Sequence, residues 1–335
     1  MPLLSPQPMA RRTWLHRALL ALAGVAVIPV LAQTPPPKWP SKPIRIVVGF
    51  PPGGLTDAYA RNYGEHLSSK LGVPVVVDNK PGAGAMIAID AVAKSPPDGH
   101  TLLMSTSGTV WQNRVLYTKL PYNLDKDLVP VANFPSGPLV VGVSDKLPVK
   151  TMAEFIEWAK KNPASMGTYA PGSYPHMVAD QTNRKHGTRI QSVHYRGEAP
   201  MWLDVASGQL QIAVGSYQAF NTVASRGVRA IGVTGSYRSP KLPQVPTLVE
   251  QGNEDKLVTL EGGLPLMAPA GTPEAVLQTL SREAVAWSNT ERAAKLRETF
   301  AIPNKPRDLA GTRSAWESEV PVWIKLAVDL GIQLD

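Results

Sequence analysis

A regular alternation of short apolar runs with helical patterns constrains the fold of this chain more than any other feature. In the first third of the chain, strand-like runs at 44–48, 73–77 and 101–104 alternate with helical patterns at 56–71 and 85–94. Strands that follow one another through helices pair in parallel, with right-handed crossovers. The order therefore predicts an α/β fold built on a mainly parallel sheet flanked by helices.

The alternation resumes after a break at 135–138 that contains two prolines and a glycine. An apolar stretch at 261–268 later precedes two helical patterns at 273–289 and 308–329. Between the break and this stretch we expect helices that begin near Thr151, Pro175 and Pro200, and strands at 139–143, 166–170, 190–195, 210–214 and 229–233.

This order predicts two lobes, each with its own sheet. Residues 44–134 and 261–335 would form lobe 1 and residues 135–260 lobe 2, so the chain leaves the first lobe and returns to it. A chain of 335 residues is long enough to build two hydrophobic cores.

The first 32 residues have the pattern of an export signal. Three arginines between positions 11 and 17 precede an uncharged apolar run at 18–32. That run is short for a membrane span and suits the apolar core of a signal peptide. We expect cleavage after Ala32; the adjacent arginines leave the twin-arginine route open as the less favoured alternative. Residues 33–43 are rich in proline and should form an extended lead-in.

Composition limits the partners. The full chain has a formal net charge of +8, which falls to +5 without the three arginines of the signal, and no cluster of Lys and Arg suggests a nucleic-acid surface. The absence of cysteine excludes disulfides, thiolate catalysis and cysteine zinc sites. We therefore expect a monomeric periplasmic protein that is not embedded in the membrane and binds neither nucleic acid nor a cofactor.

Loops rich in Gly, Ser and Thr follow three strands of lobe 1, at 51–57 (PPGGLTD), 79–84 (NKPGAG) and 105–108 (STSG). Ligands of open parallel sheets bind beyond the carboxyl ends of the strands, and the N–H groups at helix N-termini favour an anion. Each loop alone could be an ordinary turn in which Gly supplies a positive φ. Three such loops at one edge favour an anion site built from backbone N–H groups and hydroxyls.

Lobe 2 offers two matching loops, at 170–176 (APGSYPH) and 214–218 (VGSYQ). Each joins a strand to a helix through Gly and Ser. Tyr174 and Tyr217 could line a ligand site or lie in the core. Facing loops from two lobes predict a cleft that closes on a ligand.

Catalytic patterns are not matched. The chain has no P-loop, no complete dinucleotide fingerprint, no Gly-x-Ser-x-Gly and no His-Glu-x-x-His. We expect His176, beside a candidate loop, to support its own helix, and Asp57, in a first helical turn, to complement the helix dipole and hold its loop. An enzyme is therefore the weaker hypothesis, and no metal site is expected.

Several blocks of the sequence resemble the extracytoplasmic solute receptors of tripartite tricarboxylate transporters, the Bug family. The blocks follow the family's order and cover nearly the whole mature chain. They are WPSKPIRIVVGFPPGGLTDAYAR (39–61), VPVVVDNKPGAGAMIAIDAVAKSPPDGHTLL (73–103), LPYNLDKDLVPVA (120–132), HYRGEAPMWLDVASGQL (194–210), LPQVPTLVEQG (242–252) and MAPAGTP (267–273).

The resemblance implies a type II periplasmic binding fold, or Venus flytrap, that captures a small carboxylate for membrane permease subunits. Family members hold the carboxylate between two lobe 1 loops through backbone N–H groups and bridging water. Those loops match 51–57 and 82–85 here, and the family's lobe 2 loop matches Gly172, Ser173 and His176.

One block departs from the family pattern. Many members carry two acids that match Gln211 and Gly215 here. If the second acid faces the ligand, its replacement by glycine removes a partner for an ammonium group and enlarges the pocket. We therefore expect an organic acid without an amino group; aromatic or bulky acids and dicarboxylic acids are the candidates.

The sequence thus favours a receptor that captures a small carboxylate for a transporter. The alternatives are a sensory adaptor with the same cleft and, less favoured, a hydrolase or transferase. The expected ligand-binding residues are Phe50, Gly53, Gly54, Leu55, Thr56, Asp57, Gly84, Ala85, Ser105, Ser107, Gly172, Ser173, His176, Gly215 and Tyr217.

Overall fold

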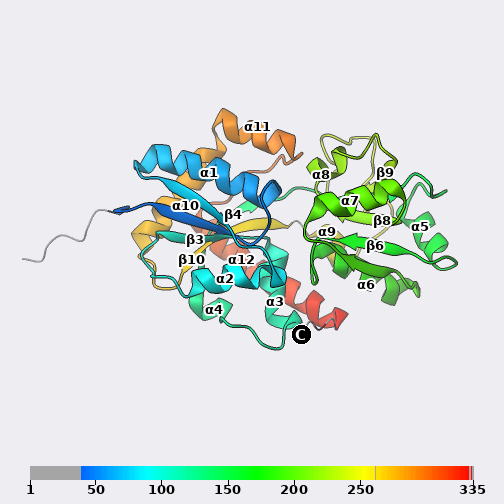
Figure 1. The fold of residues 1–335 in the computed structure, drawn as a ribbon, viewed down its shortest axis with the longest axis horizontal. Helices are drawn as coiled ribbons and strands as arrows, with labels where there is room; N and C mark the ends of the chain where they lie inside the picture. Colours follow the sequence, from blue (N-terminus) through cyan, green and yellow to red (C-terminus); the bar gives the residue numbers. More distant parts are fainter. Residues whose placement is uncertain (1–38, 261, 332, 334–335) are drawn as a thin grey trace, which may run out of the picture. The chain divides into compact units, whose positions relative to one another are not determined.

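The computed structural model describes residues 39–260, 262–331 and 333 of the chain (Figure 1). The expected signal peptide and the first residues of the proline-rich lead-in lie outside the described residues. Trp39–Asp335 form one compact unit. In the described part of the chain, no helix is long and apolar enough to cross a membrane.

The first sheet has five strands in the order β2-β1-β3-β10-β4. β1 pairs in parallel with β2 and β3, whereas β10 runs antiparallel to β3 and β4. Four strands therefore share one direction and β10 opposes them. The strands are β1 (Ile44–Val48), β2 (Val75–Asn79), β3 (Thr101–Met104), β4 (Leu128–Pro135) and β10 (Gly263–Pro269).

The second sheet repeats this plan in the order β7-β6-β8-β5-β9. β6 pairs in parallel with β7 and β8, and β5 runs antiparallel to β8 and β9. The strands are β5 (Val140–Ser144), β6 (Ser165–Thr168), β7 (Gln191–His194), β8 (Ile212–Gly215) and β9 (Val228–Val233).

The single opposing strand of each sheet is the first strand that the chain forms after it arrives from the other sheet. β5 follows β4, and β10 follows β9. Parallel neighbours need a long crossover, usually a helix, whereas an antiparallel strand does not. The expected two-lobed α/β fold with mainly parallel sheets is therefore confirmed, and the opposing strands mark where the chain changes lobe.

Helices cover both faces of each sheet (Figure 1). The expected helices are present within a few residues of their predicted ends. The sequence pattern missed strand β4 and the helices α3, α4, α9 and α11; the segments of α3 and α11 are rich in polar residues. The helices of the first lobe and C-terminal region are α1 (Leu55–Leu71), a short 3-10 helix (Ala83–Ala85), α2 (Met86–Ala93), α3 (Ser107–Leu116), α4 (Leu124–Asp127), α10 (Glu274–Ser288), α11 (Glu291–Thr299) and α12 (Leu309–Leu330). Those of the second lobe are α5 (Met152–Ala159), α6 (Tyr174–His186), α7 (Glu198–Ser207), α8 (Tyr217–Asn221) and α9 (Lys256–Thr259).

Alternate residues of β1 enter different cores, as the two-residue period of a strand requires. Ile46 and Val48 join a cluster with α1, α10 and α11, where the rings of Tyr59 and Trp287 lie 5.6 Å apart. Val47 joins a cluster on the opposite face with α2, α3 and α12. Each fully buried large apolar side chain contributes roughly 1.5–3 kcal/mol.

Helix α12 links the two lobes. Its Trp323 is 1% exposed and packs against Trp111 of α3 and Tyr174 of α6, with ring centroids 5.9 and 6.4 Å apart. The C-terminal helix therefore contributes to the wall between the lobes.

Candidate functional site

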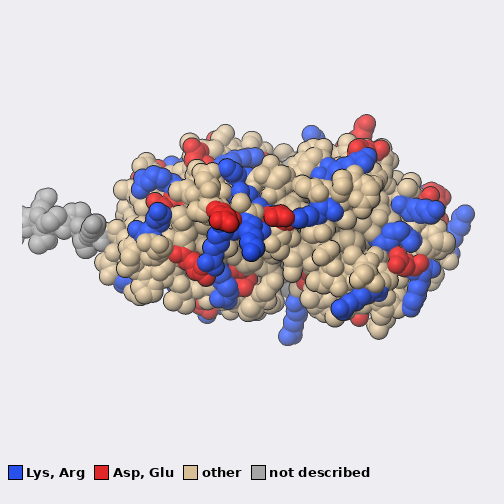
Figure 2. Space-filling view, turned by 90° about the horizontal axis from the view of Figure 1, so that it is seen from above, with Lys and Arg blue, Asp and Glu red and all other residues tan. Residues whose placement is uncertain are grey.

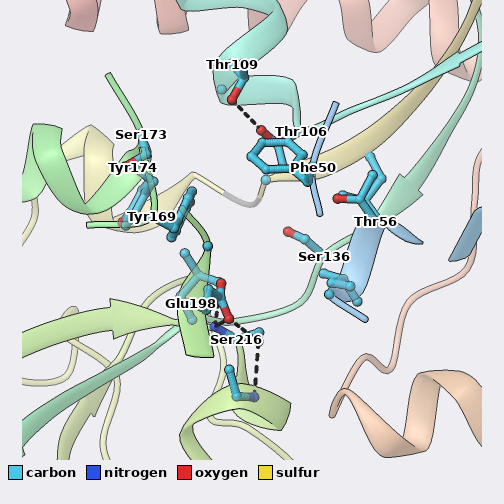
Figure 3. A pocket seen from close by; sticks show the side chains of 18 of the residues that line it. Phe50, Thr56, Thr106, Thr109, Ser136, Tyr169, Ser173, Tyr174, Glu198 and Ser216 are labelled. Atoms are coloured by element: carbon cyan, nitrogen blue, oxygen red, sulfur yellow. Dashed lines mark hydrogen bonds between the residues drawn. The ribbon is translucent and has the colours of Figure 1, made fainter. Parts of the chain in front are cut away.

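A cavity of about 430 Å³ lies between the loops at the ends of the two sheets. Figure 3 shows its walls, with Phe50 and Thr56 from the first lobe on one side and Tyr169, Ser173 and Tyr174 from the second on the other. A volume of this size suits a small organic ligand. The lining residues are Phe50, Pro51, Pro52, Gly53, Gly54, Leu55, Thr56, Thr106, Ser107, Gly108, Thr109, Ser136, Gly137, Leu139, Tyr169, Ser173, Tyr174, Arg196, Gly197, Glu198, Ala199, Pro200, Ser216, Gln218, Ala219, Thr222, Thr234, Leu260, Gly262, Gly263, Leu264 and Trp323.

Four helices begin at this cavity with no capping side chain at the N-cap. The N-cap residues of α1, α3, α6 and α7 are Gly54, Thr106, Ser173 and Gly197; all four line the cavity, and none of their side chains accepts a hydrogen bond from its helix. Helix α8 also begins at the cavity, but the side chain of its N-cap residue, Ser216, accepts from Ala219 N–H. Uncapped helix N-termini present N–H groups and a partial positive charge. Their convergence makes the cavity suitable for an anion.

Ser173 adds a hydroxyl donor to these N–H groups. The residue is 3% exposed, and its Oγ has no hydrogen-bond partner within the described part of the chain. Buried hydroxyls are normally paired, so an unpaired one beside a cavity is a candidate ligand contact. Ser107, the first residue of α3, uses its hydroxyl to join α3 to Gly263 of β10.

Asp57 holds the first loop in place and does not line the cavity. Its Oδ2 accepts from the backbone N–H of Gly53 and from Arg61 Nε, both at 3.0 Å, and its Oδ1 accepts from Asn79 Nδ2 at 3.0 Å. Asn79 also donates to the carbonyl of Phe50. Burial alone would raise the pKa of Asp57, but the hydrogen bonds from Arg61, Gly53 and Asn79 outweigh it and hold the pKa below its ordinary value. Phe50, Gly53 and Gly54 are thereby fixed at the cavity wall.

The second lobe 1 loop lies behind the first. Gly84 and Ala85 do not line the cavity, and Ala83, Gly84 and Ala85 have successive φ values of 47°, 57° and 64°. A Cβ at Gly49 would lie 2.4 Å from the Cβ of Ala85, so the loops are in close contact. Ser105 is also fully buried and outside the lining. These residues support the first loop from behind.

His176 supports the lobe 2 loop in a similar way and does not line the cavity. Its Nδ1 accepts from the backbone N–H of Gly172 at 3.0 Å, and its ring packs against His194 with centroids 4.7 Å apart. Burial, followed by the proximity of His194, lowers the pKa of His176 to about 4. A neutral ring is what acceptance at Nδ1 requires.

Gly215 leads to a correction. The residue does not line the cavity, and a Cβ there would lie 3.0 Å from Trp202 Nε1 and 3.2 Å from Glu198 Cδ. The expectation that Gly215 enlarges the pocket is therefore wrong, because these two side chains fill the space. Tyr217, also outside the lining, hydrogen bonds to Asn221.

Two charged residues escaped the sequence reasoning. Among the described residues that line the cavity, Arg196 is the one basic side chain and Glu198 the one acidic side chain. Burial raises the pKa of Glu198, although hydrogen bonds from Ser216 oppose the shift. Both residues belong to the block HYRGEAP, which joins β7 to α7. The block follows strand β7, and this position at the end of a strand is the feature of the sequence from which a cavity-lining role could have been predicted.

The remaining lining groups are mostly hydroxyls, aromatic rings and backbone. On the face shown in Figure 2, basic and acidic side chains are interspersed over the surface. Positive charge that complements an anion can therefore come from the helix N-termini and from Arg196. Among the described residues, no group of three His, Asp or Glu side chains could hold a metal ion. The fold and the site together define a two-lobed solute-binding receptor.

Comparison with known proteins identifies the family. Residues 59–302 match the model of the tripartite tricarboxylate transporter family receptor, and the chain belongs to that family. It is 32% identical to BugT of Bordetella pertussis over 94% of this chain and 96% of the relative. The resemblance to the Bug family is confirmed.

Solved structures agree with this assignment. The fold matches Rpa4515 of R. palustris, solved with adipate, with a TM-score of 0.80 and 31% identity, covering 88% of this chain and all of that one. It also matches MatC of Rhodopseudomonas palustris with bound malate, with a TM-score of 0.76 and 26% identity over 86% of this chain and all of the other. The chain is a solute-binding receptor of this family and not an enzyme.

Proposed function

We propose that this protein is a periplasmic receptor that captures a small organic carboxylate and delivers it to the permease subunits of a tripartite tricarboxylate-type transporter. One observation carries the proposal: four helix N-termini without side-chain caps converge on one cavity. Preorganised N–H groups bind anions without a counter-charge. Adipate and malate in two related receptors support the ligand class.

The lobes act as the two halves of a clamp. Residues 44–134 and 261–335 form lobe 1, and residues 135–260 form lobe 2. The loop from Phe50 to Thr56 holds the carboxylate, and Ser173 donates to it from lobe 2. Closure removes these hydrogen bonds from water and strengthens them. The export signal at residues 1–32, cleaved after Ala32, takes the monomer to the periplasm.

The cavity has room for an aromatic or a dicarboxylic acid, the two classes that the sequence suggested. An amino group on the ligand is compatible with this cavity, because Glu198 places an acid next to Gly215. We therefore define the ligand as a small carboxylate, with or without an amino group.

Gly54 gives the sharpest test of this site. Its backbone is extended, with φ −83° and ψ 177°, and a Cβ there would meet nothing within 4 Å. Gly54→Val should therefore fold normally, but its side chain should occupy the part of the cavity beside the first loop. A thermal-shift screen of mono-, di- and tricarboxylates should find a ligand that stabilises the wild type by about 2.7 kcal/mol at roughly 100 times its Kd.

We expect Gly54→Val to abolish that shift and Gly54→Ala, its matched control, to retain most of it. Equal shifts in the wild type and the Val variant would place the ligand elsewhere. A wild-type protein that no carboxylate stabilises would refute the proposed function itself.

A further inference from the structure

We propose that Glu198 recognises the end of the ligand opposite to the bound carboxylate. It selects ligands whose far end carries a hydrogen-bond donor, which is either a hydroxyl or an ammonium group, over fully ionised dicarboxylates. The inference rests on the proposed function and narrows its ligand class.

The placement of Glu198 suits this role. The residue occupies the first turn of α7, directly after Gly197, whose φ of 114° turns the chain into the helix. Figure 3 shows its carboxyl group beside Tyr169 and Ser216, on the other side of the hollow from Thr56. A ligand whose carboxylate lies at the first loop therefore directs its far end toward Glu198.

The hydrogen bonds of Glu198 define what it can accept. Within the described part of the chain its partners are both groups of Ser216, the backbone N–H at 3.1 and 3.2 Å and the hydroxyl at 2.5 Å. The Ser216 hydroxyl also accepts from Ala219 N–H as the N-cap of α8, so its single proton is directed to Glu198. A carboxylate has about four acceptor positions, so Glu198 can accept further donors but offers none when ionised.

The surrounding packing holds the carboxyl group in place. Its Cδ lies 3.2 Å from the position of a Cβ on Gly215, and Trp202, which is fully buried, lies beside the same point. Glu198 therefore cannot withdraw toward β8 when a ligand enters. An ionised ligand carboxylate that lies against ionised Glu198 would meet a like charge, which disfavours binding.

The experiment compares matched acids of equal chain length by calorimetry near neutral pH. The six-carbon series is hexanoate, its terminal hydroxy and terminal amino derivatives, and adipate; the four-carbon series is built in the same way from butyrate to succinate. The proteins are the wild type, Glu198→Gln, which keeps the shape and removes the charge, and Glu254→Gln, an exposed charge control in the same lobe.

In the series that binds, we expect the wild type to prefer the hydroxy or amino acid over the diacid by about tenfold or more. Glu198→Gln should reduce this preference by about tenfold, because it weakens the binding of the hydroxy and amino acids and strengthens the binding of the diacid. Glu254→Gln should behave as the wild type. If Glu198→Gln does not fold, Glu198→Met removes the same charge with a similar volume.

A wild type that binds the diacid more tightly than both donor ligands would overturn the inference, as would a preference of unchanged size in the Glu198 variants. Either result would leave the receptor function standing, since that function requires only that some carboxylate binds. Loss of binding for every acid in the wild type would instead refute the receptor proposal.

Discussion

Replacement of Asp57 by asparagine tests whether a buried carboxylate, outside the cavity, organises the anion-binding loop. Each oxygen of Asp57 accepts from two donors. Oδ2 receives Gly53 N–H and Arg61 Nε, and Oδ1 receives Asn79 Nδ2 and Arg61 Nη2 at 2.9 Å. Whichever way the introduced amide group were turned, its NH₂ would face two donors.

The expected cost follows from this geometry. One of the two donors left without an acceptor belongs to Arg61, whose side chain is 51% exposed and can turn to water. The other, Gly53 N–H or Asn79 Nδ2, loses a part-buried hydrogen bond to a charged acceptor, and such a bond contributes about 1.5–3 kcal/mol. We expect Asp57→Asn to lower the free energy of unfolding by about 2 kcal/mol and to weaken carboxylate binding about tenfold through the loosened loop.

The pH dependence supplies an independent check. The folded-state pKa of Asp57 lies below its ordinary value of 3.8, so its stabilisation is complete above that pH and is lost as the pH falls through the folded-state pKa. The difference in stability between wild type and Asp57→Asn should therefore be constant near neutral pH and narrow in acid. Urea unfolding at several pH values measures this difference.

Asp180 provides the matched control. It also pairs with an arginine four residues later, Arg184, at 2.7 Å, but this pair lies on the surface of α6. Asp180→Asn should cost no more than about 0.5 kcal/mol. Asp57→Asn and Asp180→Asn proteins of equal stability would refute the role assigned to Asp57.

Two further predictions concern lobe 2. The pKa of His176 is lowered to about 4 from its ordinary value of 6.5, so the unfolded chain takes up a proton at a higher pH than the folded chain. The free energy of unfolding should therefore fall as the pH drops from 6.5 toward 4. An NMR titration of the His176 ring with a midpoint near 6.5 would contradict this prediction. Gly215→Asp would force a side chain against Glu198 and Trp202 and should lower the free energy of unfolding by about 1–3 kcal/mol. Adding Glu198→Ala in the same chain should partly restore the stability. A thermal unfolding midpoint of Gly215→Asp equal to that of the wild type would refute this packing.

The sequence was sufficient to place the first wall of the cavity. The carboxyl ends of parallel strands meet at one edge, so the loops after β1, β3 and β6 had to lie together once the strand–helix alternation was recognised. Phe50, Gly53, Gly54, Leu55, Thr56, Ser107 and Ser173 were expected from this rule, and all of them line the cavity. Local pattern and sheet topology determine these positions without knowledge of packing.

Other lining residues depend on packing between distant segments. Trp323 reaches the cavity from the C-terminal helix because it packs between Trp111 and Tyr174, and no local pattern specifies that contact. The loop at 82–85 shows the converse. Its three successive left-handed residues turn it behind the first loop, although its Gly-rich sequence reads like that of a ligand loop. Two of these residues are alanines, for which this conformation is costly and hard to foresee.

Gly215 and Glu198 show why a change of one residue in a family pattern is a poor guide to a pocket. Taken alone, glycine in place of an acid suggests lost charge and added space. In the folded chain, Glu198 and Trp202 fill the space beside Gly215, and Glu198 brings a carboxylate to the same wall from a different helix. A side chain at 215 would press against Glu198 and Trp202, so the two positions must be considered together. The charge at this wall of the cavity therefore depends on both positions, and the glycine at 215 considered alone does not predict it.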